Sequence, residues 1–141
     1  MNVAETAPAL ARVEKKWVVW LGRALSALPA AMLTMSGVVK LSHLPDFVKR
    51  WTETMGFPEG ALTGVGLIEL ACVAVYLVPR TATLGAILVA AYLGGAVATH
   101  VRLGDYGGVA TPVLLGVLAW AGLWLRDRRL RELFPLRGRS A

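Results

Sequence analysis

The chain has 141 residues, 56% of them hydrophobic, and this composition indicates a one-domain membrane protein and excludes an ordinary soluble domain. The formal net charge is +6, but the basic residues flank apolar segments and form no separate basic face, so we expect no nucleic-acid partner. A single cysteine, Cys72, excludes an intramolecular disulfide, and two histidines without a Cys/His cluster predict no metal site.

Residues 1–16 are expected to form a cytoplasmic N-terminal tail, because they show little apolar pattern and end in basic residues. A first membrane span is predicted from about Trp17 to Leu41. Trp17 and Trp20 stand at its start, where an aromatic belt would lie at the lipid headgroups.

The longest loop, residues 42–59, has an internal pattern of its own. Phe47, Trp51 and Met55 recur every four residues, and Gly56 follows directly. This stripe predicts a short helix lying in the membrane interface and ended by the glycine. The alternative is an ordinary capping loop.

The second predicted span, residues 61–78, is eighteen residues long and carries one charge, Glu69, at its middle. At 1.5 Å per residue this carboxyl group lies about 13 Å from either end of the span. An ionised carboxylate at such depth is costly, so Glu69 needs a partner, water or a proton.

A third span is predicted at residues 82–99 and a fourth at residues 109–125, after a loop that contains His100, Arg102 and Asp105. Small residues recur every four positions in the third span and would let another helix approach closely, either within the bundle or in a homo-oligomer. These residues are Ala82, Ala86, Ala90, Gly94 and Ala98.

Residues 126–141 form a basic tail with six arginines against two acidic residues, and we expect it to lie on an anionic membrane surface. Together with Arg80 in the turn after the second span, the basic flanks place both termini in the cytoplasm. The predicted fold is therefore all-α: a polytopic four-transmembrane-helix bundle, residues 17–125, with a short interfacial helix after the first span.

Four short stretches carry a resemblance to the DoxX-like family, and the resemblance covers about residues 17–128. They are SGVVKL at 36–41, the G-x-x-x-G-x-G-x-x-E-L run of Gly60 to Leu70, YLVPRT at 76–81 and YLGGAVATHVR at 92–102. The resemblance implies a small four-helix protein of a bacterial cell (inner) membrane. It also implies association with a membrane oxidoreductase and with quinone-like compounds, although most members have no assigned activity.

Glu69 is the strongest functional candidate. It could bind a polar group of a lipophilic ligand, or it could move a proton in general acid–base work. The structural alternative is a carboxyl group hydrogen-bonded to Ser36, Tyr76 or Tyr92, or paired with Lys40 or Arg102.

Lys40, His100 and Arg102 should lie at the outer mouth of the bundle and make it electropositive, able to admit an anionic or quinone-like headgroup. Lys40 could instead snorkel to the headgroups, and His100 could be ordinary polar surface or a proton donor near neutral pH. Tyr76 and Tyr92 are candidate ligand contacts whose alternative is packing between helices.

Three functions stay open, and the sequence does not decide whether the protein is an enzyme. The first is an accessory or anchor protein of a membrane redox system that handles a quinone or similar lipophilic compound without a cofactor of its own. The second is a self-sufficient isomerase or hydratase with Glu69 and His100 as catalytic groups. The third is a scaffold or assembly factor without a ligand.

Overall fold

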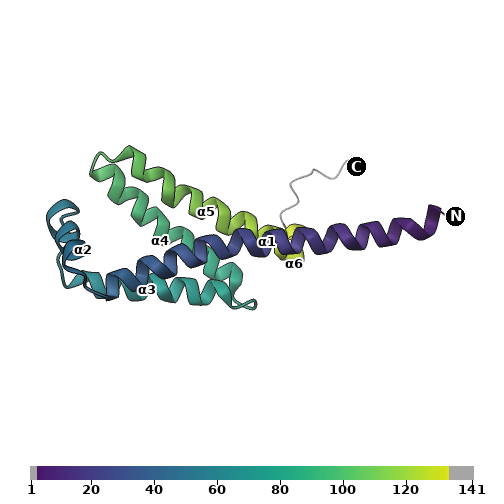
Figure 1. Cartoon of the computed structure of the whole chain (residues 1–141), viewed down its shortest axis with the longest axis horizontal. Coiled ribbons are helices and arrows are strands. Elements are labelled where there is room, and N and C mark those ends of the chain that lie inside the picture. Colours follow the sequence, from purple (N-terminus) through teal and green to yellow (C-terminus); the bar gives the residue numbers. More distant parts are fainter. Residues whose placement is uncertain (1–2, 134–141) are drawn as a thin grey trace.

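The computed structural model describes residues 3–133, with side chains for residues 16–131, and this part of the chain is helical without a strand. It contains four long helices and a short segment between the first two of them, and Figure 1 shows how these elements are arranged. In chain order the elements are α1 (Val3–Leu41), α2 (Pro45–Lys49), the π-helical turn η1 (Arg50–Thr54), α3 (Ala61–Leu77), α4 (Ala82–Arg102), α5 (Tyr106–Arg126) and α6 (Arg128–Leu133).

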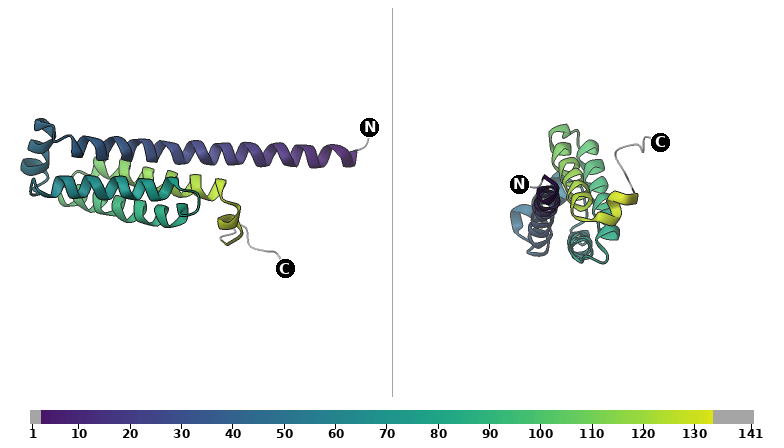
Figure 2. Two further views of the ribbon diagram at one scale, coloured as in Figure 1. Left: turned by 90° about the horizontal axis from the view of Figure 1, so that it is seen from below. Right: turned by 90° about the vertical axis from the view of Figure 1, so that its right-hand side faces the viewer.

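The four long helices pack in a ring. α1 packs against α3 and α5, and α4 packs against the same two helices from the opposite side. The end-on view in Figure 2 shows this arrangement. Two ends can be distinguished: the open end holds α2, η1 and the turn after α4, and the closed end holds the α3–α4 turn and the junction between α5 and α6 (Figure 1).

Three of the helices are long and apolar enough to cross a membrane: Lys16–Leu41 within α1, Ala82–Arg102 and Tyr106–Arg126. The remaining one, α3, is equally apolar in character but has 17 residues. The prediction of an all-helical membrane protein is therefore confirmed, with three candidate spans.

Several helix boundaries differ from the predicted ones. α1 begins at Val3 and not near Trp17, and the candidate span within it is Lys16–Leu41. α4 continues to Arg102, and α5 already begins at Tyr106. The sequence bounds were drawn where apolar residues stop, whereas helices continue into polar flanks as long as their backbone groups are paired.

The predicted short helix after the first span is present as α2 and η1, and its position in the interface stays a prediction. Trp51 is buried, and the rings of Phe47 and Phe57 stack on it with centroids 6.5 and 4.7 Å away. The Trp51 indole donates a hydrogen bond to the carbonyl of Pro58 at 3.1 Å. Gly56 has a φ of 70°, a conformation that favours glycine and ends the segment.

Close backbone contacts hold the closed end together. A Cβ atom on Gly122 of α5 would lie 2.8 Å from the carbonyl oxygen of Gly22 on α1. A Cβ on Gly85 of α4 would lie 2.2 Å from the backbone of Tyr76 on α3. Because any side chain at these positions would collide with backbone, glycine permits the helices to touch here.

The small-residue ridge of α4 divides into two halves. Ala82 and Ala86 are buried within the ring, whereas Gly94 and Ala98 are exposed. Gly94 lines an apolar groove of about 830 Å³ between α4 and α5. The first half thus serves the ring itself, and a homo-oligomer through the second half stays a prediction.

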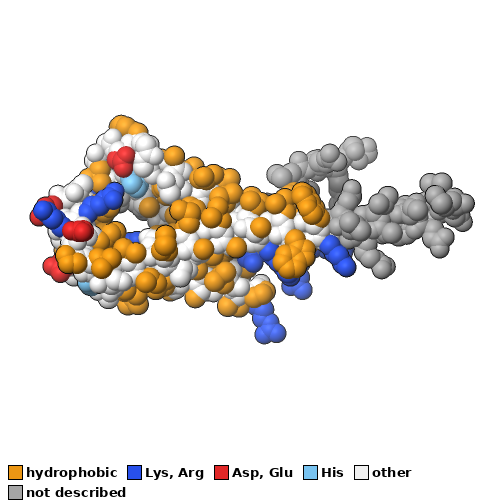
Figure 3. All heavy atoms as spheres, viewed as in Figure 1, with side chains coloured by type: hydrophobic (Ala, Val, Ile, Leu, Met, Phe, Trp, Pro, Cys, Tyr) orange, Lys and Arg blue, Asp and Glu red, His pale blue; other side chains and the backbone are white. Residues whose placement is uncertain are grey.

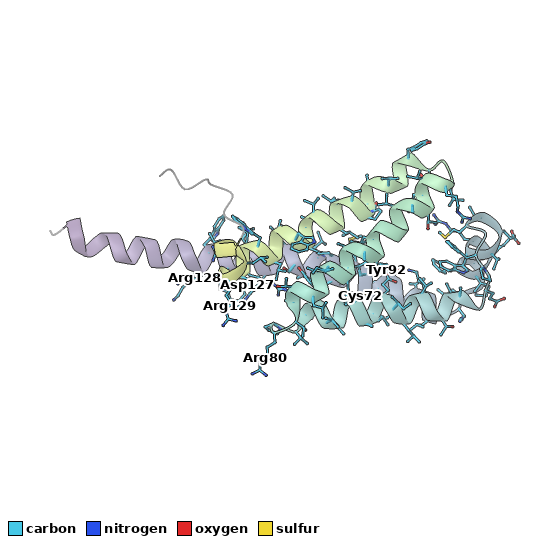
Figure 4. All side chains as sticks on the ribbon, turned by 180° about the vertical axis from the view of Figure 1, so that it is seen from behind. Cys72, Arg80, Tyr92, Asp127, Arg128 and Arg129 are labelled. Carbon is cyan, nitrogen blue, oxygen red and sulfur yellow. The ribbon has the colours of Figure 1, made fainter. Side chains whose placement is uncertain are left out.

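The start of the basic tail folds as α6 against the closed end, with Leu130 only 5% exposed. Its arginines Arg128 and Arg129 lie at the same end as Arg80 (Figure 4). Residues 134–141, which include the rest of the predicted surface-binding tail, lie outside the described residues.

Candidate functional site

The site begins with a close crossing of α1 and α3 at Gly37 and Gly66. A Cβ on Gly66 would lie 3.3 Å from the Gly37 carbonyl oxygen and 3.1 Å from the Cβ of Lys40. Lys40 and Glu69 each lie three residues beyond these glycines, about one turn of helix. The crossing therefore brings the two charged side chains within reach of one another.

Lys40 and Glu69 form a buried ion pair. The Lys40 Nζ lies 2.9 Å from the Glu69 Oε2, and the side chains are 10% and 1% exposed. The same ammonium group donates to the Ser36 hydroxyl at 2.6 Å and lies 6.0 Å from the centroid of the Phe47 ring. Lys40 thus points into the ring of helices, and its charge and hydrogen bonds compensate the burial of Glu69.

A third helix contributes Tyr92, whose side chain lies close enough to Glu69 to interact with its carboxylate. Cys72 lies nearly one turn beyond Glu69 on α3 and is buried. Figure 4 labels both residues, Tyr92 on α4 and Cys72 on α3. The carboxylate is therefore held by groups from α1 and α4, and its surroundings combine one cation with two neutral polar groups.

A second polar pair, His100 with Asp105, lies at the turn from α4 to α5. The His100 Nδ1 is 2.9 Å from the Asp105 Oδ2, and the Gly108 backbone N–H donates to Oδ1 at 3.0 Å. These hydrogen bonds, the Gly108 one first, hold the pKa of Asp105 below its usual value. One carboxylate oxygen of Asp105 thereby caps α5, and the other orients the imidazole ring of His100.

Gly108 is required for this arrangement. A Cβ atom there would lie 2.2 Å from the His100 Nδ1 and 2.3 Å from the Asp105 Oδ2. The imidazole and the carboxylate therefore occupy the space that a side chain at position 108 would need.

Two cavities meet at His100. One, of about 450 Å³, lies between α3, α4 and the aromatic residues of η1 and the loop after it, Trp51 and Phe57. Lys40 and Tyr92 also line it. The other, of about 350 Å³, lies between α1, α4 and α5 and is lined by Ser36, among others. His100 lines both. Figure 3 shows the face hollowed at this end, with basic side chains and a histidine at the rim.

The structure brings together four of the six predicted ligand-binding residues: Lys40 and Glu69 as an ion pair, and Tyr92 and His100 in the cavity beside it. Tyr76 lies elsewhere, where its hydroxyl donates to the carbonyl of Ala119 at 2.8 Å. Arg102 is exposed, donates to the carbonyl of Met55 and lies 5.1 Å from the Phe57 ring. It joins the end of α4 to Met55 and Phe57, which follow η1, and forms no ion pair with Glu69.

Sequence reasoning missed three contributors to the site. Trp51 and Phe57 line the larger cavity, although the four-residue stripe had indicated only an amphipathic helix. Gly108 contributes because it leaves space for the His100 ring. In the sequence, Gly107 and Gly108 directly precede the predicted fourth span, but this position does not reveal which side chain approaches the glycine.

The cavity could hold a small lipophilic molecule with hydrogen-bonding oxygens. Such sites are commonly 300–1,000 Å³, largely apolar, with few polar groups that fix orientation. Lys40, Tyr92 and His100 supply those groups here. Within residues 16–131 no three His, Cys, Asp or Glu side chains gather as a metal site would require.

The family model of the DoxX-like family matches residues 24–122, which is more than half of the chain. The match includes all of α3 and α4 and parts of α1 and α5. No curated protein and no solved structure matches the chain significantly.

Proposed function

The chain belongs to the DoxX-like family, and from that premise we propose that it binds a quinone-like compound at the open end as an accessory component of a membrane redox system. The observation that carries the proposal is the buried Lys40–Glu69 pair beside an aromatic-walled cavity of about 450 Å³. A quinone offers two carbonyl oxygens on a flat ring, and the cavity offers hydrogen-bond donors beside aromatic rings.

Donors at separate positions suit such a ligand. The Lys40 ammonium and the Tyr92 hydroxyl lie beside Glu69, and His100 lines the same cavity at the end of α4. Trp51 and Phe57 provide flat apolar surfaces for the ring. A partner oxidoreductase would exchange electrons with the bound compound, and this chain would hold and orient it.

Ligand binding can be measured by quenching of tryptophan fluorescence with decylubiquinone in detergent-solubilised protein, because Trp51 lines the cavity. We expect Trp51→Phe to remove most of the quenching and Tyr92→Phe to weaken binding about three- to tenfold, the value of one hydrogen bond. Trp120→Phe is the matched control, since Trp120 lines the groove between α4 and α5. Quenching that survives Trp51→Phe and vanishes with Trp120→Phe would refute this site.

The partner is tested separately, by co-purification from the native membrane. An oxidoreductase that co-purifies with the wild type supports the accessory role. Binding of decylubiquinone without any co-purified redox protein would limit the proposal to ligand binding.

A second candidate function is acid–base catalysis on a lipophilic substrate. It is favoured by His100, whose ring Asp105 orients at the junction of two cavities, with Glu69 nearby through Tyr92. This enzyme would lose turnover in Glu69→Gln while the protein stays folded. Retained turnover in that variant would eliminate Glu69 as the catalytic group.

The proposed topology has α3 as a fourth span, both termini in the cytoplasm and the open end outside, in a bacterial inner membrane. At 1.5 Å per residue the 17 residues of α3 extend about 26 Å, close to the thickness of the bilayer core. Its neighbours α1 and α4 both qualify as spans. A reporter fused after Ala141 should be active in the cytoplasm. A reporter that is active in the periplasm instead would show that the proposed orientation is wrong.

A further inference from the structure

A separate cavity of about 230 Å³ lies at the closed end, remote from the Lys40–Glu69 pair. It is formed where α1, the α3–α4 turn and the end of α5 meet. Its lining includes two arginines from different helices, Arg23 and Arg126. Two guanidinium groups at one small cavity repel each other unless an anion lies between them.

Arg126 is held in place with donor capacity to spare. Its guanidinium carbon lies 5.1 Å from the centroid of the Tyr76 ring, and its Nη2 donates to the Tyr76 carbonyl oxygen at 3.3 Å. Its Nε is buried and has no hydrogen-bond partner among the side chains that the structure describes, residues 16–131. A buried charged donor without an acceptor is costly, so an anion close to this guanidinium group would be stabilising.

Arg23 approaches from the lipid-facing side. It is exposed, and its guanidinium carbon lies 5.2 Å from the Trp20 ring. Trp17 and Trp20 are each 66% exposed, as expected of residues at headgroup depth. The cavity therefore opens where lipid phosphates lie.

The surrounding charge also favours an anion. Arg80, Arg128 and Arg129 lie at the same end of the molecule (Figure 4). One acidic residue, Asp127, lines the cavity, and its Oδ1 accepts the backbone N–H of Arg129 at 2.9 Å. Two guanidinium groups outweigh this one carboxylate.

We propose that the cavity between Arg23 and Arg126 binds a phosphate group, supplied by the headgroup of an anionic membrane lipid. The phosphate oxygens accept from the guanidinium groups of Arg23 and Arg126. The exposed Trp17 and Trp20 lie beside the bound headgroup. Guanidinium groups suit this ligand because their several donors match the oxygens of phosphate.

The test is native mass spectrometry of the full chain released from nanodiscs that contain equal amounts of phosphatidylglycerol and phosphatidylcholine with the same acyl chains. We expect the wild type to retain phosphatidylglycerol about tenfold over phosphatidylcholine, and Arg23→Gln and Arg126→Gln each to lose that preference. Arg80→Gln is the matched control, because Arg80 is an exposed arginine at the same end that does not line the cavity. Arg23→Gln keeps the test valid should Arg126→Gln fail to fold.

Equal retention of the two lipids by the wild type, or the same loss of preference in Arg80→Gln, would overturn the proposal. Addition of inorganic phosphate distinguishes the two sources of the group. Phosphatidylglycerol that stays bound in excess phosphate identifies the lipid headgroup as the occupant, and displacement together with a phosphate-dependent rise in melting temperature identifies the free ion at the same arginines.

Discussion

The two ends of the helix ring differ in how closely their helices pack. At the closed end, Gly22 meets Gly122 and Gly85 meets Tyr76 with backbone against backbone, and the Tyr76 hydroxyl is satisfied by the carbonyl of Ala119. At the open end, α1 and α3 approach closely at Gly37 and Gly66. The other two helices stand away from this pair, and cavities of about 450 and 350 Å³ lie between them.

The difference shows where stability and function separate in this molecule. The closed end joins its helices through glycines and apolar side chains, and its arginines lie at the margin of these contacts. The open end places an ion pair and an oriented histidine beside its cavities. The buried Lys40–Glu69 pair, which is costly to place in a membrane, therefore lies where the helices diverge.

The largest effect is expected at the open end, from breaking the Lys40–Glu69 pair. Lys40→Met leaves the 1%-exposed Glu69 without its cation and should cost about 3 to 5 kcal/mol in unfolding free energy. Combining Lys40→Met with Glu69→Leu removes both charges and should recover most of that loss. Thermal unfolding in detergent, followed by circular dichroism, measures all three proteins.

A double variant that is as unstable as Lys40→Met alone would contradict this account of the pair. A stable double variant that still binds its native partners but not decylubiquinone would favour the scaffold function, in which the pair only neutralises itself.

The next largest effect is expected at the closed end. Gly85→Ala places a methyl group 2.2 Å from the Tyr76 backbone, so α3 and α4 must separate at a cost of about 1 to 3 kcal/mol. Gly64→Ala is the control, because nothing lies within 4 Å of that position, and it should stabilise α3 slightly. The same melting experiment compares them, and equal stabilities of the two variants would show that the helices are not in contact at Gly85.

A smaller effect is expected on the exposed half of the α4 ridge. Gly94→Ala meets nothing within 4 Å, so it should stabilise the isolated chain by about 0.5 to 1 kcal/mol through helix propensity. If a second copy packs on this half, the added methyl group should weaken the dimer. Cross-linking in nanodiscs, beside the melting temperature, distinguishes the two results.

The smallest effect is expected from Asp105→Asn at the mouth of the open end. The pKa of Asp105 is lowered by the hydrogen bonds from Gly108 and His100, so its stabilising effect is full above the ordinary carboxyl pKa of about 4 and is lost as the pH falls through the lower folded value. The difference in melting temperature between wild type and variant should therefore be constant from neutral pH to about pH 5 and shrink below it. A difference that grows on acidification would show that the carboxylate is destabilising.

The sequence by itself determined the class of the protein, its family and the order of its helices. Apolar runs of sufficient length, a four-residue stripe at Phe47, Trp51 and Met55, and glycine or proline at the turns are all local signals, and each produced the expected helix. Helix ends were less predictable, because Asp105 caps α5 through the backbone of Gly108, a contact that hydropathy does not record.

Only the tertiary structure decided which polar residues belong together. From the sequence, Lys40, Arg102, Ser36, Tyr76 and Tyr92 are all possible partners of Glu69. The crossing at Gly37 and Gly66 brings Lys40 into an ion pair with Glu69. The packing of α4 places Tyr92 beside the same carboxylate. Tyr76 instead donates its hydroxyl hydrogen bond to the carbonyl of Ala119. The physical reason is that depth follows from position along a helix, whereas pairing follows from how helices rotate and cross, and that depends on contacts between segments distant in the sequence.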